Sequence, residues 1–529
     1  MATKIVTKNS STSGSAPSAS DLVQGELAVN VVDKRLYTEN NSGAIVELGT
    51  NPAGAVTMAS TLAVTGNVDF NGDLDVDGTT NLDVVDIDGA VDMASTLQVD
   101  GAATFTTEIT ANGGIALGDN DKAGTAITTG DDNVLVGYSA GDAITTGTRN
   151  VAVGTGAAGT NVSGDYNVAV GYESLTTSTA SQNTALGFRS LRSDTTGADN
   201  VAIGRSALQE NTSASNNVAV GHLSLKNNTT GTQNVAVGAL ALDANTTASY
   251  NTAVGYNALT ANTTGADNTA VGRTALENNT TADNNTAVGK AALAQNTTGA
   301  SNTALGSLAL NLNTTGISNT AVGKSALGAN TTANANTAVG YNSLTANTTG
   351  TENTAVGTEA LNATITGSYN TAVGRSALLL TTGDHNTAVG RIALRTNSSG
   401  ANNTALGSRS MYSNSSGGNN TAVGVNALDA NTTASNNTAI GYRAGTTTTT
   451  GADNVAVGSD ALFANTTGAS NVAIGHDALG ENTTASNNTA VGMSALVANT
   501  TGTGNSAVGR SALGANTTGS GNVAFGAYW

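Results

Sequence analysis

Side chains that could bind a ligand recur at regular intervals along most of the chain. The residues are tyrosines or the bases arginine, lysine and histidine, and they are spaced at multiples of about 17 positions. Aromatic rings can stack on sugars, and cationic groups can pair with an anionic polysaccharide. The alternative is that they only cover the corners of a repeating fold, because long cationic side chains can lie over apolar surface. The candidate contact residues are Tyr172, Arg205, His222, Tyr256, Arg273, Lys290, Lys324, Tyr341, Arg375, Arg391, Tyr442, His476 and Arg510.

An aspartate cluster near the N-terminus has the spacing of a calcium-binding loop. It consists of Asp73, Asp75 and Asp77, but the twelfth position of such a loop, where glutamate is required, is Val84. The same segment also fits a strand with its apolar side chains on one face and its aspartates on the other. We therefore predict no metal ion here.

The three histidines of the chain do not form a catalytic set. His222, His385 and His476 have no acid or nucleophile at a fixed spacing. A carbohydrate-cleaving enzyme on a repeated β-fold would need a carboxylate pair that interrupts the repeats, and no insertion is large enough to carry one. The sequence predicts no enzymatic activity and no cofactor.

The candidate contact residues lie within a repeat that fills three quarters of the chain. A unit typified by Asn-Thr-Ala-Val-Gly starts 24 times between Asn133 and Asn522. Of the 23 intervals, 21 are 17 residues long and two, beginning at Asn167 and Asn370, are 16. The idealised unit is N-T-A-V-G-x-x-A-L-x-x-N-T-T-G-x-x, and its residues are called positions one to seventeen below. All the candidate contact residues occupy position six.

The repeat predicts short strands and excludes helices. Glycine returns at position five of every unit and Asn-Thr-Thr returns in most units, which would break a helix before three turns. Strands of four or five residues fit positions one to five, and the invariant glycine at position five fits a corner. We expect an all-β, elongated parallel β-solenoid in which each unit forms one coil with two short strands. The asparagines at position one should form a hydrogen-bonded ladder along the rod.

The small side chain at position three suggests an association between chains. Position three is alanine in 23 of 24 units, and position four, which is always apolar, faces the opposite side of the strand. Burying one valine, one leucine and a few alanines per coil gives on the order of 6–8 kcal/mol, less than the cost of ordering 17 residues. We therefore predict that identical chains associate around a rod axis, with valine inside each coil and the alanine face packed against the neighbouring chains.

Units such as Asn251–Leu259 resemble the head repeats of trimeric autotransporter adhesins and bacterial haemagglutinins. The resemblance covers residues 133–529 and implies a trimeric parallel β-roll. The phrase Gly25–Asn30, followed by Arg35–Tyr37 and Ile45–Leu48, resembles the N-terminal module of phage tail and head fibres. That resemblance implies attachment to the virion by this end of the chain. It makes the following residues candidates for virion docking: Glu26, Leu27, Val29, Leu36 and Tyr37.

Four regions are predicted from these patterns. Residues 1–50 form the virion-attachment module, with three strands, and residues 51–118 form a repetitive β-stalk in which Val56–Leu62 returns as Val91–Leu97. Residues 119–132 form a transition, and residues 133–529 form the solenoid. Aromatic residues are rare in this chain, yet Phe525, Tyr528 and Trp529 lie together at its end, so we predict that they cap the last coil.

Charge and composition narrow the function. The net charge is −18 and the 19 basic residues are not clustered, so no nucleic acid is expected as a partner. No apolar run is long enough to span a membrane, no secretion signal is visible, and cysteine is absent. We expect a structural fibre of a phage virion, most simply a tail fibre that binds a host surface polysaccharide or protein. A head fibre or capsid decoration protein is the alternative, followed by a cellular trimeric adhesin or an ice-binding solenoid.

Overall fold

The computed structural model describes residues 7–14, 16–24, 26–32, 35–49, 115–117 and 130–527. The chain separates into two compact units, Met1–Thr104 and Phe105–Trp529, and each is described here by itself. The aspartate cluster, most of the predicted stalk, Tyr528 and Trp529 lie outside the described residues. Within the described residues there is no helix, so none that could cross a membrane.

The N-terminal unit contains a four-stranded sheet in the order β1-β2-β3-β4. The strands are β1 (Thr7–Ser10), β2 (Leu27–Asn30), β3 (Arg35–Glu39) and β4 (Ile45–Gly49). β1 runs parallel to β2, whereas β2–β3 and β3–β4 are antiparallel. The last three strands are the predicted ones, and β1 was not predicted. Leu22, Ala28 and Tyr37 form the small core of this sheet.

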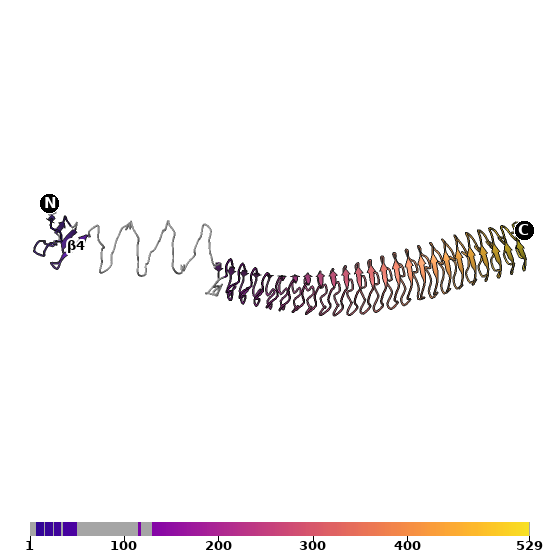
Figure 1. The fold of residues 1–529 in the computed structure, drawn as a ribbon, viewed down its shortest axis with the longest axis horizontal. Helices are drawn as coiled ribbons and strands as arrows, with labels where there is room; N and C mark the ends of the chain where they lie inside the picture. The colour runs from indigo at the N-terminus through magenta and orange to yellow at the C-terminus, as the bar shows by residue number, and fades with distance from the viewer. Residues whose placement is uncertain are drawn as a thin grey trace. The chain divides into compact units, whose positions relative to one another are not determined.

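The second unit is a parallel β-solenoid, and Figure 1 shows its strands following one another along a gently curved rod. Each strand has three residues and pairs in parallel with its neighbours in the chain. The strands are β5 (Ile115–Leu117), β6 (Val134–Val136), β7 (Val151–Val153), β8 (Val168–Val170), β9 (Thr184–Leu186), β10 (Val201–Ile203), β11 (Val218–Val220), β12 (Val235–Val237), β13 (Thr252–Val254), β14 (Thr269–Val271), β15 (Thr286–Val288), β16 (Thr303–Leu305), β17 (Thr320–Val322), β18 (Thr337–Val339), β19 (Thr354–Val356), β20 (Thr371–Val373), β21 (Thr387–Val389), β22 (Thr404–Leu406), β23 (Thr421–Val423), β24 (Thr438–Ile440), β25 (Val455–Val457), β26 (Val472–Ile474), β27 (Thr489–Val491), β28 (Ser506–Val508) and β29 (Val523–Phe525).

The predicted fold class and the assignment of one coil to each repeat are confirmed. The solenoid nevertheless begins earlier than Asn133, because β5 pairs with β6 and lies in the range predicted to be stalk. Two strands per coil were predicted, but each coil has one. Non-glycine residues at positions seven and nine have positive φ, for example Asn257 (55°) and Leu259 (52°), and this interrupts extended backbone. Backbone hydrogen bonds between coils continue there, as from Leu259 N to Ala275 O (3.0 Å).

The predicted orientation of the strands is wrong. Ala253 and its equivalents at position three are fully buried inside each coil, whereas position four, as at Val254, lies on the outer face and is only partly covered. The reason is the narrow interior, in which positions three and nine face each other. The first unit shows this, because it has Leu135 at position three and Gly141 at position nine, and a Cβ on Gly141 would lie 2.6 Å from Leu135 Cδ2. Where position nine is leucine, only alanine fits opposite.

Two asparagine ladders run through the interior. At position one, Asn268 N donates to Asn251 Oδ1 (3.0 Å), which confirms the predicted ladder. At position twelve, Asn279 Nδ2 donates to Asn262 Oδ1 (2.9 Å). Asn268 and Asn279 also converge on one carbonyl, that of Ala282 (2.9 and 3.0 Å). The second ladder was not predicted, and it satisfies fully buried amides inside the coil.

The glycine at position five is required by its backbone. Gly255 has a φ of 134°, which side-chain-bearing residues rarely adopt, and a Cβ there would lie 2.6 Å from the carbonyl oxygen of Gly272 in the next coil. The turn at this corner therefore brings successive coils too close for any side chain.

The two short units do not interrupt the solenoid. β20 and β21 pair in register, with Ala372 opposite Ala388, and Asn386 N still donates to Asn370 Oδ1 (2.9 Å). The missing residue is that of position fourteen, because Thr382 N donates to the position-thirteen carbonyl of the next coil (2.7 Å). The shortening is confined to this turn.

The interior position of alanine leads to a prediction. We expect Ala270→Leu to destabilise its coil by about 1–3 kcal/mol, because extra methylene groups cannot fit against leucine at position nine. Val271→Ala, on the outer face of the same strand, should destabilise the coil of an unassociated chain much less. Amide hydrogen exchange across residues 251–302 measures both. Equal exchange in the two variants would contradict the orientation described here.

Candidate functional site

The ridge, defined as the residues at position six, follows the glycine corner of each coil. All thirteen candidate contact residues lie on it and are exposed. Neighbouring members interact along the rod, since the rings of Tyr172 and Phe188 stack with centroids 5.4 Å apart and Lys324 Nζ lies 5.9 Å from the centroid of Tyr341. The structure therefore brings the candidates into one line, at a spacing of one residue per coil.

Arginines at position seven add to the ridge and were not predicted. Arg189 lies over the ring of Phe188 (4.9 Å to the centroid), and Arg443 lies over Tyr442 (5.4 Å) and Phe463 (4.4 Å). Such contacts hold the guanidinium and the rings in place. Arg189 and Arg443 occupy position seven, and Phe463 occupies position ten. Both positions vary freely in the sequence, so the sequence alone does not show that their side chains lie close together.

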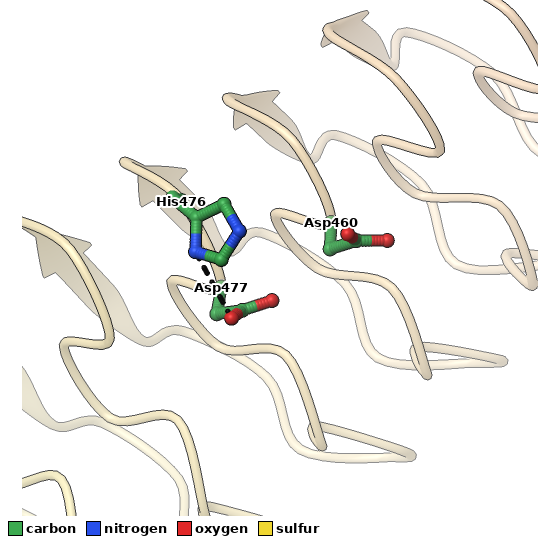
Figure 2. A group of neighbouring side chains, drawn as sticks. All are labelled: Asp460, His476 and Asp477. Atoms are coloured by element: carbon green, nitrogen blue, oxygen red, sulfur yellow. Dashed lines mark ion pairs between the residues drawn. The ribbon is translucent and has the colours of Figure 1, made fainter.

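Three side chains near the end of the rod could each offer one ligand atom to a metal ion (Figure 2). They are Asp460, His476 and Asp477, from positions six and seven of consecutive coils, and His476 Nδ1 lies 3.0 Å from Asp477 Oδ2. Asp460 is already paired with Arg443, whose Nη2 lies 2.6 Å from its Oδ1. The group is therefore best described as an ion-pair network, in which a cation would have to compete with the guanidinium for Asp460.

The outer strand face, defined as positions two and four, carries an apolar stripe at position four that extends along the whole repeat, whereas position two is threonine or serine in 15 of the 24 units. Position four is valine, isoleucine, leucine or phenylalanine in all 24 units. These side chains remain 38% exposed at Leu305, 46% at Leu406 and 41% at Ile440. Over the 24 strands of the repeat, the stripe exposes on the order of 1,000 Å² of apolar surface. This is a larger apolar patch than soluble monomers normally expose.

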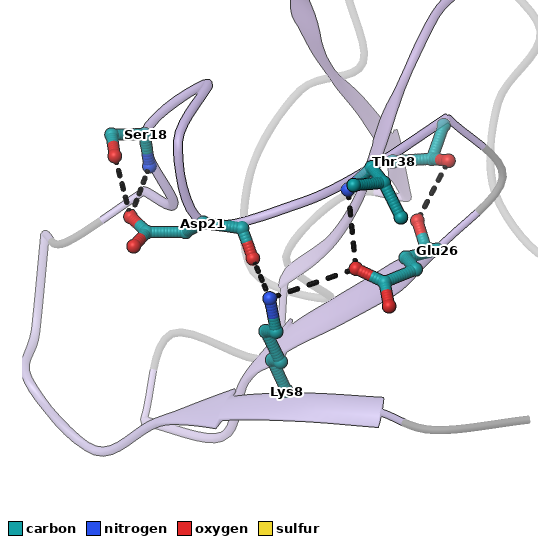
Figure 3. Close-up of polar contacts among 6 residues, drawn as sticks. Lys8, Ser18, Asp21, Glu26 and Thr38 are labelled. Atoms are coloured by element: carbon teal, nitrogen blue, oxygen red, sulfur yellow. Dashed lines mark hydrogen bonds and ion pairs between the residues drawn. The ribbon is translucent and has the colours of Figure 1, made fainter.

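The five candidate docking residues of the N-terminal sheet have different environments. Glu26 is tied down by Lys8, whose Nζ lies 3.6 Å from its carboxylate, and the backbone carbonyl of Glu26 accepts a hydrogen bond from Thr38 Oγ1 (2.9 Å) (Figure 3). Tyr37 is only 6% exposed and belongs to the core, so its side chain is not available to a partner. The remaining candidates, which are Leu27, Val29 and Leu36, are half-buried.

The last coil is only partly covered. Phe525 lies at position four of β29 with its side chain 71% exposed, on the outer face and not over the interior. Leu513 and Ala524 at this end remain partly exposed. The predicted cap would therefore depend on Tyr528 and Trp529, which lie outside the described residues, and it stays a prediction.

Asp194 is a buried carboxyl group in the asparagine ladder of position twelve. It accepts hydrogen bonds from Ser178 Oγ (2.6 Å), Asn211 Nδ2 (2.7 Å) and Gly197 N (3.1 Å). Burial raises the pKa of Asp194 to about 6, and the three hydrogen bonds oppose this shift. The sequence did carry a signal, since 17 of the 23 residues at this position are asparagine and this is the only acid.

Comparisons with known proteins find two short similarities. Over 75 residues the chain is 36% identical to the long tail fiber protein Gp37 of Enterobacteria phage T2, a stretch covering 14% of this chain and 5% of that protein. Over 49 residues it is 43% identical to the long tail fiber protein Gp37 of Escherichia phage AR1, covering 9% and 4%. The chain thus matches a small fraction of the length of these relatives. No protein family and no solved structure matches it. The partial similarity indicates a tail-fibre-like structural protein.

The environment of Asp194 predicts how stability depends on pH. Because its pKa rises from 3.8 to about 6 on folding, the folded protein binds the proton more tightly than the unfolded chain. The resulting stability is fully present below pH 3.8 and is lost as the pH rises through 6, a cost of about 3 kcal/mol at pH 8. We expect Asp194→Asn to remove this cost and to slow amide exchange in residues 178–211 at pH 8.

The control is Glu352→Gln, which removes an exposed carboxylate at position seventeen of a distant coil. Exchange around residue 194 should be unchanged in this variant. If Asp194→Asn opens the coils at pH 8, or protects them equally at pH 4 and pH 8, the buried carboxylate does not have the role described.

Proposed function

We propose that this chain is a structural fibre of a phage virion, and that it is a tail fibre which carries host attachment. The observation that carries the proposal is the similarity to phage long tail fiber proteins in a chain whose larger part is one uninterrupted solenoid. A rod of this kind gives reach and repeated surface. In this proposal the N-terminal sheet docks on a virion protein and the solenoid extends from it.

The fibre acts as a homotrimer that forms through the outer strand face. The alanine face cannot serve, because it lies inside each coil. The apolar stripe supports the alternative interface, since position four is apolar in all 24 units whereas the exposed position six changes between aromatic, cationic and small residues. Its extent matches what stable protein interfaces bury, roughly 800 Å² per partner.

The ridge is the proposed contact for the host receptor, a surface polysaccharide or protein. Its exposure, its stacked rings and its cations support this role. An ice-binding surface is less well supported. The hydroxyl of Thr263 at position thirteen donates to the carbonyl of Thr280 (3.0 Å) and its equivalents do likewise, while the threonines at position two are mostly only partly exposed, so the fully exposed threonines lie mainly at position fourteen.

Locating the chain in virions tests the proposal. Antibodies against residues 133–527 should label the tail of intact virions in electron micrographs, and the purified protein should reduce phage adsorption to host cells. Label on the capsid would instead support a head fibre or decoration protein. Virions that carry no label would overturn a structural role.

The proposed assembly can be tested on the outer strand face. We expect Val254→Gln, Val271→Gln and Val288→Gln together to convert the trimer into monomers in sedimentation equilibrium, because the stripe can no longer be buried without burying amides. Circular dichroism should keep its β-signature, since these side chains point out of the coil.

The matched control changes Thr264, Thr281 and Thr298, all exposed at position fourteen of the same coils, to glutamine. It should remain trimeric. A trimer that persists in the valine variant places the interface elsewhere.

A further inference from the structure

Opposite charges lie on the two sides of the outer strand face. The ridge, at the end of each strand, has seven arginines or lysines and no acid among its 24 residues, in a chain of net charge −18. The acidic edge, defined as positions sixteen and seventeen immediately before each strand, has nine acids and a single arginine. The apolar stripe therefore has a cationic border on one side and an acidic border on the other.

Four strands carry both charges at once. The acid precedes the strand and the cation follows it in the pairs Asp199 and Arg205, Asp267 and Arg273, Asp283 and Lys290, and Asp384 and Arg391. All eight side chains are exposed. Six or seven residues of mainly extended chain separate the members of a pair, which is too far for contact within one coil. Among the described residues, none of these eight side chains takes part in an ion pair.

Threefold symmetry would bring these borders together. If three parallel chains turn their outer strand faces toward a common axis, the strand-end border of one chain lies beside the strand-start border of the next. Figure 1 shows the strands in one row along the coils, so the positions of each border follow one another along the rod, with a charged residue in some of the coils. At equal height along the rod, the cation of a given strand then faces the acid of the same strand in the neighbouring chain.

We propose that the ridge and the acidic edge form a ladder of ion pairs between protomers, with Asp199–Arg205, Asp267–Arg273, Asp283–Lys290 and Asp384–Arg391 meeting across each interface. The partner of this surface is a second copy of the same chain, and the inference rests on the proposed trimer. The pairs fix the axial register of the chains, because the apolar stripe is nearly identical in every coil and does not itself distinguish one register from another. Four ridge cations thus serve assembly, and the other ridge residues remain available to a receptor.

A charge-reversal experiment on the full chain tests the pairing. The first variant combines Arg205→Glu and Arg273→Glu, which places like charges opposite Asp199 and Asp267 of the next chain. We expect the concentration at which half the trimer dissociates to rise about tenfold or more, since six pairs per trimer become repulsive. The matched control combines Lys324→Glu and Arg375→Glu, which make the same charge change on strands without an acid at their start, and it should dissociate nearly as the unchanged protein does.

The second variant adds Asp199→Lys and Asp267→Lys to the first. The pairing predicts that it regains the trimer, and that it does not exchange subunits with the unchanged protein, because a mixed interface would oppose like charges. Free exchange of subunits, or a first variant that behaves like the control, would overturn the pairing and leave the trimer in place. An unchanged protein that is monomeric would overturn the proposed trimer and the pairing with it.

Discussion

The structure depends on hydrogen bonds that run along the rod from one coil to the next. Each coil is too small to hold a core of its own, and its buried apolar side chains are mostly one leucine and two alanines. Backbone groups pair between coils around much of the turn, and two lines of buried asparagine amides satisfy the polar groups that remain inside. A buried amide without a partner would cost more than the small core could offset. The ladders, more than the apolar packing, therefore hold successive coils in register.

The narrow interior explains why the repeat tolerates so little change at some positions. Glycine at position five lies against the glycine of the next coil, and alanine at position three lies opposite leucine at position nine. Leu135 with Gly141 shows that a large side chain at position three is accommodated where position nine has none. Positions six, sixteen and seventeen face outward, so they can vary, and the charged and aromatic side chains of the solenoid gather largely there and at positions seven and ten.

Much of the fold could be predicted from the sequence, because the spacing of the recurring residues gives the length of each coil. The solenoid, the coil length and the ladder at position one all follow from which residues recur. Alternation along a strand distinguishes two faces without saying which one is inside, so Ala253 and Val254 were assigned to the wrong sides. The prediction of a second strand in each coil was also wrong, since nothing in an alanine-leucine pair shows that Leu259 adopts a positive φ. Tyr37 was a docking candidate through a resemblance alone, and a strand of five residues does not show in the sequence that its aromatic side chain belongs to the core of the small sheet.

The uniform register between coils has a consequence for how such a protein can change over generations. Since each coil contacts only the coils immediately before and after it, the gain or loss of one whole repeat in the gene leaves every remaining contact intact. Unequal recombination between the near-identical repeats would thus lengthen or shorten the rod in steps of about 4.8 Å without an unstable intermediate. The length of the rod is then inherited as a number of copies, and it can be adjusted independently of the surface that any single coil displays.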